Sequence, residues 1–339
     1  MAKMRAMVVR ERGGPFAAEE RDIPAPGREE MRIRVQACGV CHSDVVTVQG
    51  LFPIVQYPRV PGHEVIGVID AIGDGVQGWK VGERAGVGWF GGSCNYCRQC
   101  RRDNAFACEN VHEISGVTRD GGYATHMIAR ASAVAHVPDN LDPIESAPLL
   151  CAGVTTFNAL RHTGAGPGDI VAVHGLGGLG HLGVQYAARQ GFRTVAVNRG
   201  RDKEELAKKL GASDYIDSAA EDPAKALTAM GGARAILATV TDGKAMEGIA
   251  GGLGANGVMM AIGAVGPLTV NILDLIGKSA GVRGWYSGVA RDSEDTLAFS
   301  KLNNVVSMNE IFPLEKAQEA YERMLSGKAR FRVVLKMDA

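Results

Sequence analysis

The sequence has no excess of charge of either sign, because Lys and Arg together number 37 and Asp and Glu together also number 37. A chain without an overall positive field has little general attraction for a polyanion, so we expect no nucleic acid partner. The sequence also lacks an apolar signal core near its start and any stretch of about 18 uncharged apolar residues. We therefore expect a cytoplasmic protein with no membrane partner.

Internal repeats and low-complexity tracts are absent too, and 339 residues exceed what one hydrophobic core usually serves. Residues 1–151 contain short alternating strands broken by Gly and Pro, which indicate a β-rich, barrel-like domain. In residues 152–286 apolar strands alternate with helical patterns, as in βα units that form a parallel sheet. We expect residues 287–339 to return to the first domain. The predicted fold class is α/β, with one β-rich domain and one doubly wound domain.

A glycine-rich segment lies between a strand predicted at residues 170–174 and a helical pattern. Its residues are Gly175, Leu176, Gly177, Gly178, Leu179 and Gly180. In this context the G-x-G-x-x-G pattern is typical of a dinucleotide-binding turn, with the phosphates at the helix N-terminus. Gly175 permits the tight turn, Gly177 admits the pyrophosphate, and Gly180 packs helix on strand. The alternative is a Gly-rich turn without a ligand.

The residues after the next predicted strand, 194–197, bear on the choice of cofactor. An NAD enzyme usually has an acidic residue there to bind the ribose 2′-hydroxyl, but this sequence has Asn198. Arg199, Arg201 and Lys203 follow. A neutral residue followed by cations suits a 2′-phosphate, so NADP is favoured over NAD. The alternative is that these cations only form a solvated helix start.

Four of the seven cysteines lie within 15 residues, in a lobe predicted at 91–110. They are Cys94, Cys97, Cys100 and Cys108. An odd total without an export signal makes disulfides the poorer explanation. Four thiolates fit a closed tetrahedral zinc with no position for a substrate, which indicates a structural site. An iron–sulfur cluster and free cysteines are the alternatives.

Further metal-ligating residues are spread along the chain: Cys41 in GVCHSD, His63 and Glu64 in PGHE, and Cys151 in PLLCAGVT. A catalytic zinc keeps three protein ligands and an open position, and two Cys with one His form a recognised set. Spacing alone does not bring these residues together, because each is equally compatible with an ordinary buried Cys or core His.

The order of these motifs along the chain is typical of one enzyme family. The pattern GHE-x2-G-x5-G-x2-V at residues 62–76, followed by the four-cysteine lobe and the glycine turn, resembles the zinc-containing alcohol dehydrogenases of the medium-chain dehydrogenase/reductase superfamily. GVCHSD, GWFGGSCNYC and LLCAGVTTFNAL are similar to the microbial alcohol dehydrogenase and cinnamyl-alcohol-dehydrogenase-like branch. The resemblance implies a GroES-like catalytic domain and a Rossmann domain. It also implies hydride transfer between NAD(P) and primary alcohols or aldehydes, aromatic ones included.

By this resemblance, Cys41, His63 and Cys151 are the catalytic zinc ligands. Glu64 matches the acidic neighbour that can enter the shell of the metal. Together with the structural site in the lobe, this catalytic site gives two zinc ions per chain. Asp44 matches the carboxylate that orients the ligand histidine.

Other site residues also follow from the resemblance. His42 and Arg332 match cations at the pyrophosphate, Thr155 a residue beside the nicotinamide, and Ile262 a further cofactor-binding residue. Phe52 and Trp89 match aromatic residues that line the substrate pocket. Together with them, Trp285 and Tyr286 indicate a pocket for primary alcohols and aldehydes, aromatic ones included. Core packing is the commoner role for an aromatic residue and is the alternative.

The proton path departs from the family pattern. Ser43 matches the hydroxyl that takes the proton from the alcohol, but many relatives carry a histidine where this sequence has Val46. We expect the proton to leave through Ser43, the cofactor ribose and solvent, or by way of His42.

Three other functions share some of these sequence features. A zinc-free quinone reductase would lack both cysteine sets, and a zinc-ribbon nucleic acid binder would not need the dinucleotide turn. A polyol or secondary-alcohol dehydrogenase of the same superfamily is the alternative function, since it differs mainly in its substrate. Relatives assemble as dimers or tetramers, so we expect a homodimer or homotetramer.

Overall fold

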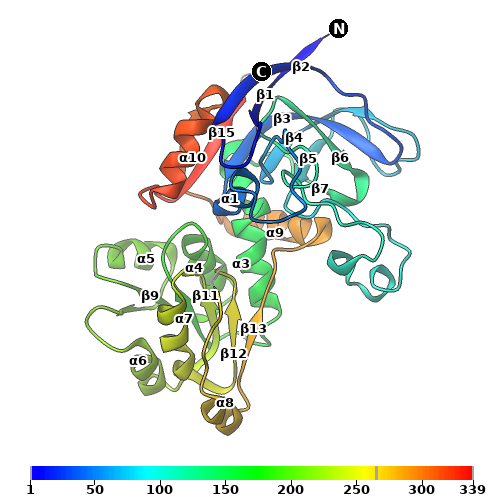
Figure 1. Cartoon of the computed structure of the whole chain (residues 1–339). Coiled ribbons are helices and arrows are strands. Elements are labelled where there is room, and N and C mark those ends of the chain that lie inside the picture. The colour runs from blue at the N-terminus through cyan, green and yellow to red at the C-terminus, as the bar shows by residue number, and fades with distance from the viewer. Residues whose placement is uncertain (1, 264–265, 338–339) are drawn as a thin grey trace. The chain divides into compact units, whose positions relative to one another are not determined.

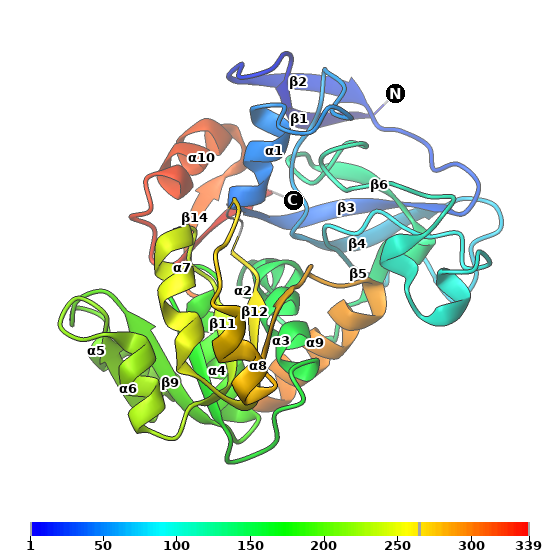
Figure 2. The same cartoon turned by 60° about the horizontal axis from the view of Figure 1, so that its bottom comes forward.

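The computed structural model describes residues 2–263 and 266–337, which fall into two compact units. Unit 1 contains the described residues up to Cys151 and from Gly288 onward, and unit 2 those of Ala152–Ser287. The boundaries expected from sequence, 1–151, 152–286 and 287–339, differ from this division at Ser287. Figures 1 and 2 show the elements of both units coloured along the chain.

Unit 1 is built on a seven-stranded sheet with the order β14-β15-β3-β4-β5-β7, in which β6 also pairs with β3. These strands are β3 (Glu30–Val40), β4 (Val65–Ile72), β5 (Arg84–Val87), β6 (His126–Arg130), β7 (Val134–His136), β14 (Asn309–Pro313) and β15 (Arg332–Lys336). A separate antiparallel pair is formed by β1 (Lys3–Val9) and β2 (Phe16–Asp22). Because β15 pairs antiparallel with β3, the red end of the chain in Figure 1 lies beside a blue strand. The chain after unit 2 thus completes unit 1.

The long strand β3 shows why the first part of the chain forms a sheet. Met31, Ile33 and Val35 alternate along it and are buried in the core of unit 1. This period of two is typical of a strand with one face on the core. The α-helices described in this unit are α1 (Val45–Val48), α2 (Pro143–Ser146), α9 (Ala290–Asn303) and α10 (Ala317–Leu325).

Unit 2 is a six-stranded parallel sheet with the order β10-β9-β8-β11-β12-β13. Its strands are β8 (Ile170–His174), β9 (Arg193–Asn198), β10 (Asp214–Asp217), β11 (Ala233–Ala238), β12 (Leu253–Ala261) and β13 (Gly281–Gly284). Its helices are α3 (Ala152–Arg161), α4 (Gly180–Arg189), α5 (Glu204–Leu210), α6 (Pro223–Ala229), α7 (Gly243–Ile249) and α8 (Ile272–Lys278). The strand order matches the doubly wound dinucleotide-binding fold. The predicted fold class is confirmed.

The strand order of unit 2 reverses between β8 and β11, which are neighbours in the sheet. Ligands of such sheets bind at the carboxyl ends of the strands at this point. The glycine turn directly follows β8 and therefore lies there. Within the described residues, no helix is both long and apolar enough to cross a membrane.

Candidate active site

Four residues far apart in the sequence converge in unit 1. The ligand atoms of Cys41, His63, Glu64 and Cys151 all lie within 4.8 Å of one another. We call them the Cys41 cluster. Sheet register explains half of this meeting, because Cys38 near the end of β3 pairs with Val65 at the start of β4. Cys41, which follows β3, is thus brought beside His63 and Glu64, which precede β4. Cys151, the fourth member, directly follows a 3₁₀ helix at Ala147–Leu150.

The donor set of the Cys41 cluster fits a zinc ion. The sulfur atoms of Cys41 and Cys151 are 3.8 Å apart, and both cysteines are free. Nε2 of His63 and Oε2 of Glu64 are buried and have no hydrogen-bond partner among residues 2–263 and 266–337. Buried polar atoms are normally paired, and thiolate and imidazole ligands are those that zinc prefers. A metal ion would satisfy these atoms together.

The electrostatics of the Cys41 cluster favour a thiolate. The hydrogen bond with Cys151 lowers the pKa of Cys41 well below its usual value, although burial opposes this. The charge of Arg332 lowers it further. Since the thiolate is the form that binds metal, the site is prepared for an ion.

Asp44 organises two members of the Cys41 cluster. Its Oδ1 lies 3.0 Å from Nδ1 of His63, and its Oδ2 accepts a hydrogen bond from the backbone N–H of Cys41 at 2.8 Å. Because Nδ1 lies beside the Asp44 carboxylate, Nε2 of His63 is the ring nitrogen left for a metal. Oδ2 also accepts a bond of 2.9 Å from the hydroxyl of Tyr123. Burial and the Asp44 charge raise the pKa of Tyr123, so the hydroxyl keeps its proton and donates.

Glu64 has a second partner, Arg332. The guanidinium Nη2 of Arg332 contacts Oε1 of the carboxylate, and both side chains are buried. A Cβ at Gly39 would lie 1.8 Å from Oε2 of Glu64, so only glycine fits beside it on β3. Burial opposes the charge of Arg332, but the charges of Glu64 and Cys41 raise its pKa. The structure therefore assigns Arg332 a partner that the sequence did not reveal, while its contact with a pyrophosphate stays a prediction.

Three of the aromatic residues predicted for the substrate pocket have different surroundings. The ring of Trp89 meets that of His63 edge to face, with centroids 4.9 Å apart. Phe52 lies in a turn and is 41% exposed. In unit 2, Trp285 packs against His162 with ring centroids 4.3 Å apart. Trp89 is thus the one of these three for which the described structure gives a ring contact with the Cys41 cluster.

The residues of the predicted proton path follow Cys41 directly. A 3₁₀ helix spans His42–Asp44, in which His42 is exposed and Ser43 half-buried. Val46 is half-buried in α1. Ser43 is therefore two residues from the thiol of Cys41 and retains some exposed surface.

A second group of sulfur atoms forms within the predicted lobe. The Sγ atoms of Cys94, Cys97, Cys100 and Cys108 lie within 4.8 Å of one another. Backbone N–H groups point at these sulfurs, for example from Glu109 to Cys97 and from Val111 to Cys108, at 3.4 and 3.3 Å. Such donors stabilise thiolates, and although burial opposes the effect, backbone N–H groups lower the pKa of Cys94 to about 6. The geometry fits a closed site of four thiolates.

The glycine turn of unit 2 has the geometry expected for each glycine. Gly175 has a φ of +96°, and a Cβ at Gly180 would lie 1.7 Å from the Gly175 carbonyl oxygen. At Gly177 a Cβ would meet no described atom within 4 Å, so the backbone there is open to a ligand. Two predicted cofactor residues hold the turn: Asn198 Oδ1 accepts from the Leu176 N–H at 3.1 Å, and Lys203 Nζ donates to the Leu176 carbonyl at 2.8 Å.

The other predicted cofactor residues of unit 2 are spread over its elements. Arg199 is exposed after β9, Thr155 is buried in α3, and Ile262 follows β12. None of these positions conflicts with a role beside a dinucleotide, and their roles stay predictions.

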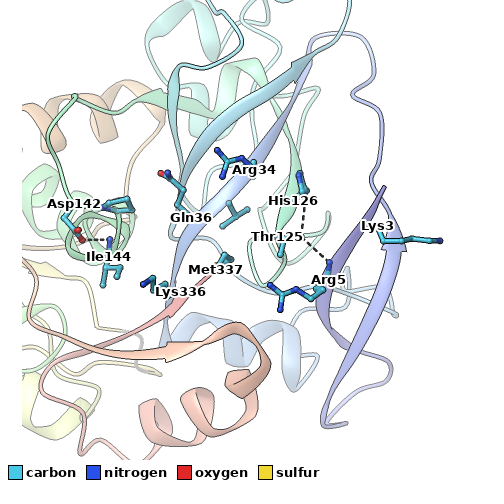
Figure 3. A pocket seen from close by; sticks show the side chains of 12 residues that line it. Lys3, Arg5, Arg34, Gln36, Thr125, His126, Asp142, Ile144, Lys336 and Met337 are labelled. Atoms are coloured by element: carbon cyan, nitrogen blue, oxygen red, sulfur yellow. Dashed lines mark hydrogen bonds between the residues drawn. The ribbon is translucent and has the colours of Figure 1, made fainter. Parts of the chain in front are cut away.

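Unit 1 also contains a cavity of about 490 Å³, which Figure 3 shows. Its cations include Lys3 and Arg5, but Lys3 pairs with Asp22 at 2.8 Å and Arg5 contacts Glu315. Asp142 at its rim caps α2. This cavity shares no lining residue with the Cys41 cluster, so we do not assign the reaction to it.

Comparison with known proteins gives the family. Residues 27–139 match the alcohol dehydrogenase GroES-like domain, and residues 178–302 match the zinc-binding dehydrogenase family. Alcohol dehydrogenase patD of Penicillium expansum is 43% identical over 330 residues, which cover 97% of this chain and 96% of that protein. An alcohol dehydrogenase of Geobacillus stearothermophilus is 38% identical and covers 98% of this chain and 99% of its own.

Solved structures agree over nearly the whole chain. A cinnamyl alcohol dehydrogenase of Sorghum bicolor has a TM-score of 0.88 at 28% identity, covering 99% of this chain and 98% of its own. The Helicobacter pylori CAD complexed with NADP(H) has a TM-score of 0.87 at 25% identity and the same coverage. The cobalt- and zinc-bound alcohol dehydrogenase of Pyrobaculum aerophilum has a TM-score of 0.88 at 25% identity, covering 99% and 100%. The resemblance seen in the sequence is confirmed, and the chain belongs to the zinc-binding alcohol dehydrogenase family.

Proposed function

We propose that this protein interconverts primary alcohols and aldehydes, aromatic ones included, with a zinc ion in the Cys41 cluster and a nicotinamide cofactor on unit 2. The observation that carries the proposal is the convergence of two thiols, an unpartnered buried imidazole nitrogen and a carboxylate oxygen within 4.8 Å. A zinc- and cobalt-bound relative from Pyrobaculum aerophilum supports the choice of metal. A secondary alcohol or polyol is the alternative substrate.

Zinc bound in this site would polarise an alcohol or carbonyl oxygen, and the nicotinamide would exchange a hydride with the adjacent carbon. Side chains of the protein transfer the proton and orient the metal ligand. Ser43 takes or returns the proton of the reacting oxygen, and Asp44 keeps His63 in a ligating orientation. Trp89, edge to face with His63, provides an aromatic wall that suits a benzylic or cinnamyl group.

The proton leaves this site by a shortened path. Since Val46 replaces the usual histidine, we propose that it passes from Ser43 through the cofactor ribose to solvent, or by way of the exposed His42. The branched apolar side chain of Val46 can neither donate nor accept a proton.

We propose a second, structural zinc at the four cysteines of the lobe. Four thiolates close a tetrahedral site and leave no position for a substrate. Both sites need reduced thiols, and this is our reason to propose a cytoplasmic location.

For the cofactor we propose NADP in preference to NAD. Asn198 ends β9 without a negative charge, and the exposed guanidinium of Arg199 follows it. A 2′-phosphate would gain a cationic partner there, whereas a 2′-hydroxyl finds no acidic acceptor at the end of β9. The NADP(H) complex of the Helicobacter pylori relative supports this choice.

We propose a homodimer or homotetramer. In the described sheet of unit 2, β13 is an edge strand, and α8, which precedes it in the chain, exposes Ile272, Leu273 and Ile276 at 57, 78 and 68%. Open edges and exposed apolar side chains of this kind favour association. Light scattering behind size exclusion would measure the assembly, and Leu273→Glu is expected to shift it toward smaller species.

Initial rates test the proposed reaction. The substrates are aliphatic, benzylic and cinnamyl aldehydes, a ketone and a polyol, each with NADPH or NADH, or with the oxidised cofactor for the polyol. We expect the highest kcat/KM for a primary aldehyde with NADPH. Metal analysis should give two zinc ions per chain, and Cys41→Ser should lose one of them together with turnover while keeping the fold. Full activity in Cys41→Ser would refute the proposal.

A further inference from the structure

Tyr123 reaches two of the proposed zinc ligands through a single carboxylate. Its side chain is fully buried, and its hydroxyl donates to Oδ2 of Asp44 at 2.9 Å. The same carboxylate accepts from the Cys41 backbone and lies 3.0 Å from Nδ1 of His63. We propose that Tyr123 is a positioning residue. Its hydroxyl fixes the rotation of the Asp44 carboxylate, which in turn keeps the ring of His63 oriented toward the other members of the Cys41 cluster. This inference rests on the proposed zinc site.

The division of bonds between the two carboxylate oxygens supports this role. Oδ2 of Asp44 takes both the Cys41 N–H and the Tyr123 hydroxyl, which leaves Oδ1 for His63. The terminal torsion of an aspartate is intrinsically broad, so hydrogen bonds must hold it. Without the tyrosine hydroxyl, Oδ2 would keep a single donor, and the carboxylate would be free to turn away from Nδ1 of His63.

Tyr123 is itself held by the segment that carries the histidine. Its backbone N–H donates to the Pro61 carbonyl at 2.9 Å, and its own carbonyl accepts from Met7 at 2.8 Å. A Cβ at Gly62 would lie 2.5 Å from Cδ1 of Tyr123, so the glycine lets the ring lie against this segment. The ring also packs on Phe16, with centroids 5.7 Å apart. Supports of this kind, fixed by packing, are what keeps a metal site in its productive geometry.

Tyr321 offers a matched control. It is also buried, and its ring packs on the same Phe16 with centroids 5.6 Å apart. Among the residues that the structure describes, no hydrogen bond joins its hydroxyl to Asp44. Tyr123→Phe and Tyr321→Phe therefore remove the same atom from neighbouring parts of one core, and only the first removes a bond to Asp44.

The test is zinc release from the full-length, zinc-loaded protein. Zinc is drawn off by excess EDTA and followed with a zinc-sensitive dye, and Cys41→Ser identifies which kinetic phase belongs to the Cys41 cluster. We expect Tyr123→Phe to speed that phase by roughly tenfold, a typical effect of losing support around a metal ligand. The phase of the four-cysteine lobe should not change, and Tyr321→Phe should match the wild type.

Two further measurements separate positioning from general loosening. In an Asp44→Ala background, Tyr123→Phe should have no additional effect on release, because the carboxylate that it holds is gone. The visible absorption of the cobalt-substituted protein should shift in Tyr123→Phe and not in Tyr321→Phe. An unchanged release rate, equal acceleration of both phases, or an undiminished effect with Asp44→Ala would each overturn the proposal. Equal metal content in Cys41→Ser and wild type would refute the zinc site itself, and the positioning role with it.

Discussion

Glu64 and Arg332 contact each other inside unit 1, with 0 and 8% of their side chains exposed. Removing one member of such a buried pair leaves the other charge without compensation, which costs about 3–5 kcal/mol of unfolding free energy. We expect this loss for Arg332→Met, measured by denaturant unfolding. Adding Glu64→Gln should recover part of the stability, because the remaining charge disappears. Additive losses in the double variant would contradict the coupling.

Cys97→Ser should remove the zinc of the four-cysteine lobe and leave the zinc of the Cys41 cluster in place. Its sulfur accepts N–H groups from Cys100 and Glu109 in the lobe. We expect the variant to bind one zinc instead of two and to lose more than about 3 kcal/mol of stability, because metal loss is among the few changes with so large a cost. Metal analysis and denaturant unfolding measure both effects. Cys38→Ala, which removes a buried thiol outside both clusters, should keep two zinc ions; if it does not, the assignment is wrong.

Arg199→Ala tests the cofactor preference. A hydrogen bond to a charged group is worth about 1.5–3 kcal/mol, so KM for NADPH should rise on the order of tenfold or more, with little change for NADH. Steady-state kinetics with both cofactors measure this. Lys208→Ala is the control, because Lys208 pairs with Glu204 at 2.8 Å on α5. Equal effects of Arg199→Ala on both cofactors would argue against a bound 2′-phosphate.

Val46→His should restore a proton path. We expect alcohol oxidation to accelerate on the order of a few-fold below its optimum pH, because an imidazole can carry the proton outward. Val45→His is the matched control, since Val45 is also half-buried and belongs to the same helix. If the oxidation rate and the pH profile of Val46→His equal those of the wild type, the missing relay is irrelevant.

His174 should make stability depend on pH. Burial lowers its pKa from 6.5 to about 4, so below pH 6.5 the unfolded chain binds a proton that the folded chain does not. Stability from this group is complete above about pH 6.5 and falls as the pH drops toward 4, by about 3 kcal/mol in all. Denaturant unfolding of His174→Gln should show a smaller loss over this window. His112→Gln, at an exposed position, should retain the wild-type slope.

The sequence indicates local features well. The four cysteines within 15 residues and the glycine turn between a strand and a helix each act over a short segment, so their spacing carries the information. Cys41 and Cys151 are 110 positions apart, and only the family resemblance paired them before the structure did. Long-range partners are set by strand register, which spacing does not reveal.

Two contacts show this limit. Tyr123 bonds Asp44 across 79 positions, and Arg332 meets Glu64 because β15 pairs with β3. Neither partnership has a local signal, since a Tyr after two glycines or an Arg at the start of a strand is common. Trp285, which the sequence suggested for the substrate pocket, packs against His162 within unit 2, and its role in a pocket stays a prediction.

The pairing of β15 with β3 has a consequence for biosynthesis. Glu64 leaves the ribosome 268 residues before Arg332, the residue that compensates its charge. Unit 2 is continuous in sequence and can fold while it emerges, whereas unit 1 must wait for its last strand. During translation the nascent chain therefore carries Glu64 without its cationic partner for most of the time that its synthesis takes.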